Sequence, residues 1–121
     1  MAKRVLIADD ELHIQASVSY IVKQAGYEVI TADNGQEAVD RAISELPDLV
    51  ISDIMMPKKN GFEVCEALRQ HPALKDTYII LLTARGQDSD VEQGLKVGAN
   101  EYVTKPFSPI KLQQKIKELL G

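Results

Sequence analysis

Five short apolar segments alternate with five amphipathic segments along the 121 residues, and this alternation constrains the fold more than any other feature. The apolar segments are residues 5–8, 27–32, 49–52, 78–83 and 101–104. Two of them contain the uninterrupted runs Leu49-Val50-Ile51 and Ile79-Ile80-Leu81-Leu82. Such runs are typical of strands in a parallel sheet that is covered on both faces. The sequence therefore predicts an α/β fold of the (βα)₅ type, an open doubly wound five-stranded parallel sheet with right-handed crossovers.

The segments between these strands have the apolar spacing of helices, as the recurrence at Ile14, Val18 and Ile21 illustrates. Residue types that begin helices precede several of them, namely Asn34 with Glu37, Asn60 with Glu63, Ser89 with Glu92, and Ser108 before Pro109. Glycines suited to ending a helix follow at Gly26 and Gly98. The segment 88–97 is the weakest predicted helix, because it has few apolar anchors and carries Gly94, which costs about 1 kcal/mol relative to alanine.

Composition excludes several classes of protein. A net charge of −4 offers no basic surface for nucleic acid. No apolar run approaches the ~18 residues of a membrane span, and the run at 5–8 is too short for a signal peptide. The only cysteine, Cys65, rules out an intramolecular disulfide. We expect one cytoplasmic domain over residues 1–121, with no direct nucleic-acid or membrane binding.

Polar side chains cluster where the predicted strands end. Asp9 and Asp10 follow the first strand, Asp53 the third and Lys105 the fifth, while Thr83 ends the fourth. In open α/β sheets, ligands bind at the carboxyl ends of the strands, where the strand order reverses. With the order 2-1-3-4-5, Asp53 is expected between the acid pair and Thr83.

Each of these residues also has a simpler interpretation. The acid pair could cap the first helix, whose dipole favours anions. Asp53 could be a turn residue before Pro57, Thr83 a hydroxyl at a strand end, and Lys105 a solvated loop charge. All four interpretations would have to coincide at one edge of one sheet, which favours a functional site.

The motifs together resemble the receiver domain of bacterial response regulators, the phospho-accepting module of two-component signalling. The resemblance spans the chain and rests on Asp9-Asp10, on Asp53 within Ile-Ser-Asp-Ile-Met-Met-Pro followed by Gly61, on Leu82-Thr83-Ala84, and on Tyr102 followed by Lys105-Pro106-Phe107. It implies a flavodoxin-like sheet of order 2-1-3-4-5.

The resemblance implies a Mg²⁺ site, in agreement with the preference of that ion for oxygen ligands. Asp10, Asp53 and the backbone carbonyl of Met55 would bind the ion directly, and Asp9 through water. Asp53 would be the nucleophile that forms an aspartyl phosphate. Lys105, the Thr83 hydroxyl and the Ala84 amide would hold the phosphoryl oxygens. The resemblance thus implies a switch that assists its own phosphorylation and dephosphorylation, and not an enzyme with a separate substrate.

The resemblance also implies a conformational response. Thr83 and Tyr102 would move inward on phosphorylation, changing the surface formed by the helix after Arg85, the fifth strand and the last helix. Met55 and Arg85 would tune the phosphate lifetime.

Partners implied by the resemblance are a sensor histidine kinase or phosphotransfer protein, and a downstream output domain or protein. The motifs around Thr83 and Lys105 are closest to those of receivers of winged-helix transcriptional regulators, which dimerise through cross-subunit ion pairs. Glu101 and Lys115 retain the charges of one such pair, whereas Val91 and Lys111 do not retain a second. We expect a monomer or a weak phosphorylation-dependent dimer, as a stand-alone receiver or as part of a longer regulator.

Three other functions fit the sequence less well. A Mg²⁺-dependent phosphohydrolase would need a second acid two residues after the nucleophile, where this chain has Met55. A flavin-binding relative of flavodoxin would need a Ser/Thr/Gly-rich loop where this chain has Asp-Asp-Glu. A receiver-like module that only binds partners usually lacks Asp53 or Lys105, and both are present.

Overall fold

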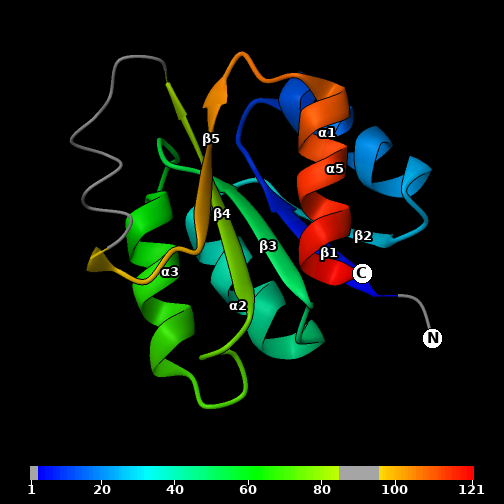
Figure 1. The fold of residues 1–121 in the computed structure, drawn as a ribbon. Coiled ribbons are helices and arrows are strands. Elements are labelled where there is room, and N and C mark those ends of the chain that lie inside the picture. The colour runs from blue at the N-terminus through cyan, green and yellow to red at the C-terminus, as the bar shows by residue number, and fades with distance from the viewer. Residues whose placement is uncertain (1–2, 85–95) are drawn as a thin grey trace.

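A five-stranded parallel sheet of order β2-β1-β3-β4-β5 forms the centre of the molecule (Figure 1), as predicted. The structure is a computed structural model that describes residues 3–84 and 96–121. The strands are β1 (Arg4–Ala8), β2 (Glu28–Ala32), β3 (Leu49–Asp53), β4 (Tyr78–Ala84) and β5 (Glu101–Lys105). Asp53 and Lys105 were expected just after their strands, but hydrogen bonding extends β3 and β5 to include them as last residues, so their backbones are held in the sheet.

Helices cover both faces of the sheet (Figure 1). The helices α1 (Leu12–Gln24) and α5 (Pro109–Leu120) pack on one face, and α2 (Gly35–Glu45) and α3 (Gly61–Gln70) pack on the other. Successive side chains of β1 enter the two layers in turn: Val5 and Ile7 join α1 and α5, whereas Leu6 and Ala8 join α2 and α3. The two apolar layers explain why the central strands carry continuous apolar runs.

Most predicted helix boundaries are confirmed. Asn60 and Glu63 form a complete capping box, and the Ser108 hydroxyl accepts a hydrogen bond from the Lys111 amide before Pro109. Asn34 accepts from the Glu37 amide. Gly26 and Gly98 have φ angles of 93° and 96°, the left-handed conformation expected after a helix end.

One alternative interpretation is wrong, and one predicted helix lies largely outside the described residues. Glu11 is the residue that precedes α1, and its side chain makes no capping hydrogen bond, so neither Asp9 nor Asp10 occupies the cap position. Of the predicted helix 88–97, only Lys96 and Val97 lie within the described residues, and the Ser89–Glu92 box lies outside them. None of the described helices has the length and apolar character needed to cross a bilayer.

Candidate functional site

Three carboxylates meet at the carboxyl edge of the sheet. Asp9 and Asp10 follow β1, Asp53 ends β3, and these two strands pair directly, with Ala8 opposite Ser52. One carboxylate oxygen from each residue lies within 4.8 Å of the others. Asp9 is fully buried and Asp53 is 6% exposed, whereas Asp10 is exposed. Three hard oxygen donors with one open side fit a small divalent cation such as Mg²⁺.

Lys105 supplies a positive charge to the same site from the end of β5. Its Nζ lies 3.3 Å from Asp53 Oδ1 and 3.4 Å from Asp9 Oδ2. Glu11 Oε1 is 3.8 Å from the same nitrogen, so this residue contributes to the charge of the site as well as preceding α1. Without Glu11, the three aspartates and Lys105 carry a net charge of −2, which one divalent cation would balance.

Burial and charge shift the pKa values in opposing directions. Burial raises the pKa of Asp9 above its ordinary value, although the Glu11 amide and Lys105 oppose the shift. Burial, followed by the nearby Asp9 carboxylate, raises the pKa of Asp53. Burial alone would lower the pKa of Lys105, but Asp53 and Asp9 outweigh it and raise that pKa. The site therefore disfavours its own negative charge and favours the lysine cation.

Backbone groups orient the two buried carboxylates. The Glu11 amide donates to Asp9 Oδ1, and the Ile54 amide donates to Asp53 Oδ1, each at 2.9 Å. The Ser52 hydroxyl, itself buried, donates to the Asp53 carbonyl at 2.9 Å. Gln15 Nε2 lies within 3.2 Å of the Asp9 and Ala32 carbonyls and so fastens α1 to the ends of β1 and β2. Ser52 and Gln15 were not predicted from the sequence. Ser52 is marked only by its position next to Asp53, and Gln15 has no local sequence signal.

The remaining predicted residues surround this cluster. Thr83 is 4% exposed and lies in β4, one residue beyond the partner of Asp53 in the sheet register. Ala84 pairs with Lys105 in the backbone ladder. Tyr102 is partly buried against the layer that contains α2 and α3. Met55 is 77% exposed in the loop after Asp53, and Arg85 lies outside the described residues.

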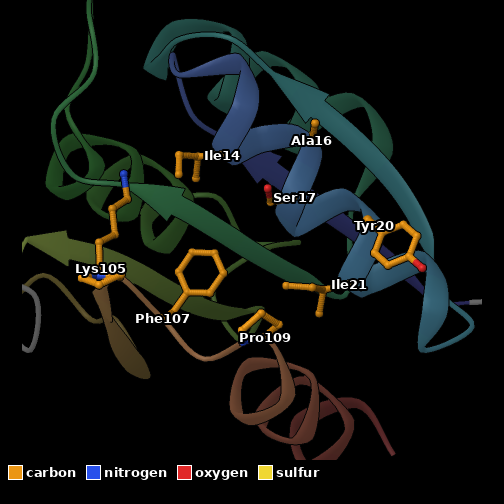
Figure 2. Close-up of a pocket in the computed structure, with 9 residues that line it drawn as sticks. Ile14, Ala16, Ser17, Tyr20, Ile21, Lys105, Phe107 and Pro109 are labelled. Carbon is orange, nitrogen blue, oxygen red and sulfur yellow. The ribbon is translucent and has the colours of Figure 1, made fainter.

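An open groove of about 610 Å³ adjoins Lys105 on the side of α1 (Figure 2). One wall comes from α1 and includes Ile14, Ile21 and the 65% exposed Tyr20. The other wall comes from the segment after β5 and includes Phe107 and Pro109. An apolar surface therefore leads directly to the lysine of the site.

Glu101 and Lys115 face each other within the chain, although the sequence suggested them for contact with a second subunit. Lys115 Nζ lies 3.4 Å from Glu101 Oε2, between α5 and β5, and the side chains of Lys115 and Glu101 are 32% and 41% exposed. This pair is on the face of β5 and α5, away from the acid cluster.

Comparisons with known proteins agree with this geometry. Residues 5–117 match the model of the response regulator receiver domain. The alkaline phosphatase synthesis transcriptional regulatory protein PhoP of Bacillus subtilis is 42% identical over 120 residues, 99% of this chain and 49% of that protein. The phosphate regulon transcriptional regulatory protein PhoB of Pseudomonas aeruginosa is 39% identical over 120 residues, 99% of this chain and 52% of that protein. The chain thus spans about half the length of the curated relatives that it matches.

A solved structure has the same fold. The chemotaxis response regulator CheY4 of Vibrio cholerae matches with a TM-score of 0.92 at 36% identity, covering 98% of this chain and 99% of that one. The similarity of fold therefore extends over nearly the whole of both chains.

Proposed function

Because the chain belongs to the response regulator receiver domains, we propose that Asp53 accepts a phosphoryl group from a phosphohistidine of a sensor kinase or phosphotransfer protein. The observation that carries this proposal is the setting of Asp53: a nearly buried carboxylate, 3.3 Å from Lys105 Nζ and grouped with Asp9 and Asp10. We take residues 1–121 as one such receiver unit, acting in the cytoplasm as a switch and not as an enzyme with a separate substrate.

Asp10, Asp53 and the Met55 carbonyl would hold Mg²⁺, with Asp9 contributing through water. The bound ion supplies positive charge that offsets the negative charge of the phosphoryl oxygens. Asp9 is the best fixed of the acids, since the Glu11 amide and Lys105 hold its two oxygens. Asp10 is the exposed acid of the three, so its charged carboxylate is not desolvated by burial and can bind the ion directly.

In the transfer, a carboxylate oxygen of Asp53 attacks phosphorus and the bond from phosphorus to the donor imidazole nitrogen breaks. The bond electrons remain with the imidazole, and the product is an acyl phosphate. Lys105 Nζ, already 3.3 Å from Asp53, would bind one phosphoryl oxygen, and the Thr83 hydroxyl and Ala84 amide would receive another.

Phosphorylation exchanges one carboxylate for a group of roughly −2 charge. Lys105 and Thr83 would be drawn toward it, and Tyr102 would follow Thr83 inward. Tyr102 lies in β5, which pairs with the β4 strand that carries Thr83, so the two residues share one ladder. The surface around β5 and α5 would then change for an output domain or partner.

The groove beside Lys105 is suited to the phosphate donor. Its apolar walls from α1 and from Phe107 end at the lysine that contacts Asp53, so a helix lying in it could present a phosphohistidine to the acceptor.

The test is phosphorylation by a small donor. The protein is incubated with Mg²⁺ and acetyl phosphate, and the intact mass is compared with that of Asp53→Asn. We expect a gain of one phosphoryl group that depends on both Mg²⁺ and Asp53. Equal labelling of the two proteins would refute the assignment of Asp53.

A further inference from the structure

Gly35, the first residue of α2, lies against the backbone of a loop that is distant in the sequence. A Cβ added at Gly35 would lie 1.9 Å from the Lys59 carbonyl oxygen and 2.5 Å from its carbon. The Gly35 amide also donates to the Pro57 carbonyl at 3.3 Å. The start of α2 therefore contacts residues 57 and 59 at a distance that only glycine permits.

The loop in question connects the proposed acceptor to α3. It follows Asp53, contains Met55, and ends at Gly61. Its far end is closed by a 2.8 Å hydrogen bond from the Gly61 amide to the Ile54 carbonyl. Its centre is tightly turned, because the Lys59 amide donates to the Pro57 carbonyl at 2.8 Å and Lys58 has a φ of 69°. Gly35 contacts this turn directly.

We propose that Gly35 is a positioning residue for the metal site. By admitting the Lys59 backbone, it fixes the loop 54–60 and thereby the Met55 carbonyl. This inference rests on the proposed function, in which that carbonyl is a Mg²⁺ ligand. Groups that orient metal ligands without touching the ion typically change metal affinity by about 10–100-fold when they are altered.

The effect of Gly35→Ala on α2 alone would be stabilising, and so would not explain a loss of Mg²⁺ affinity. Gly35 has no left-handed φ, and alanine has a higher helix propensity than glycine, so Gly35→Ala on its own would favour the helix. Any loss of Mg²⁺ affinity must therefore come from the displaced loop.

The experiment measures Mg²⁺ binding without phosphorylation, by calorimetric titration with MgCl₂ and by amide chemical shifts of residues 54–60. Gly35→Ala is compared with wild type and with Gln36→Ala, which places alanine on the exposed neighbouring position. Circular dichroism melts select a temperature at which all proteins are folded. Pro57→Gly is a second variant, which loosens the same turn without a steric clash and serves if Gly35→Ala does not fold.

We expect Gly35→Ala to weaken Mg²⁺ binding by about 10–100-fold, with shifted amides in 54–60, while Gln36→Ala binds like wild type. Pro57→Gly should weaken binding in the same direction. Unchanged affinity in a folded Gly35→Ala, or in Pro57→Gly when Gly35→Ala is unfolded, would overturn the role of Gly35. Absence of Mg²⁺ binding by wild type is a different result, which would overturn the proposed metal site and this inference together.

Discussion

Replacing Lys105 by methionine should destabilise the metal-free protein at neutral pH. The substitution retains the length of the side chain but removes the charge that lies 3.3 Å from Asp53 and 3.4 Å from Asp9. At an effective dielectric of 20, each contact corresponds to a gross attraction of about 5 kcal/mol. Removing one partner of a buried pair typically costs about 3–5 kcal/mol. Because the Lys105 side chain is 21% exposed, we expect a loss of about 2–4 kcal/mol in the free energy of unfolding.

Urea or thermal denaturation in EDTA measures this loss. For a domain of this length, about 4 °C per kcal/mol gives a fall in Tm of roughly 8–16 °C. Lys111→Met, at an exposed position of α5, is the matched control and should change Tm little. Adding Mg²⁺ should recover part of the loss, because a cation that binds the folded state replaces the missing charge.

A double mutant identifies the cause. In an Asp53→Asn background, Lys105→Met removes the ion pairs with Asp9 and Glu11 but no longer one with Asp53, so its cost should be distinctly smaller. If Lys105→Met is as stable as wild type in EDTA, or costs the same in both backgrounds, the electrostatic explanation fails.

Other predictions concern the ionisation of Asp53, the hydrogen bonds of Arg69 in α3, and the exposed side chain of Met55. Because the pKa of Asp53 is raised in the folded protein, ionisation of Asp53 lowers the free energy of unfolding as the pH rises from the ordinary carboxylate range through the raised value. Metal-free Asp53→Asn should therefore be more stable than wild type at pH 7. Urea melts over a pH series should show this difference shrinking as the pH falls. Arg69 donates hydrogen bonds to the carbonyls of Gly98 and Thr77 at 2.9 Å and 2.6 Å. In the same urea melts, Arg69→Met should lower the free energy of unfolding by about 2–3 kcal/mol. A change near zero would mean that water fully replaces these hydrogen bonds. Met55→Asn, at a 77% exposed position, should change Tm by under about 2 °C yet alter the rate of phosphate loss followed by intact mass. An unchanged rate would refute a role of the Met55 side chain in the phosphate lifetime.

Much of the fold could be predicted because local and global signals agree. The apolar runs at Leu49 and Ile79 identify central strands since both faces of the sheet are covered, and Asn60 with Glu63 marks a helix start through bonds within four residues. The site could be predicted because the carboxyl ends of parallel strands share one edge, which brings Asp9 and Asp53 together.

Contacts that do not follow from the order of the strands could not be predicted. The approach of Lys59 to Gly35 depends on how a loop packs on a helix, and one glycine among seven carries no local sign of it. Arginine is usually a surface residue, yet the Arg69 guanidinium donates hydrogen bonds to Gly98 and Asn100 in the segment before β5. These contacts depend on tertiary packing, which residue spacing does not encode.

The ion pair between Glu101 and Lys115 has a consequence for self-association. Both charges already have a partner within their own chain at 3.4 Å. A second copy that used the same charges would exchange intrachain pairs for interchain pairs, with little change in their number. Since exposed pairs contribute about 0–1 kcal/mol each, this exchange would be nearly neutral in free energy. These charges would therefore select which surfaces can meet, while the affinity of any dimer would have to come from the apolar contacts around them.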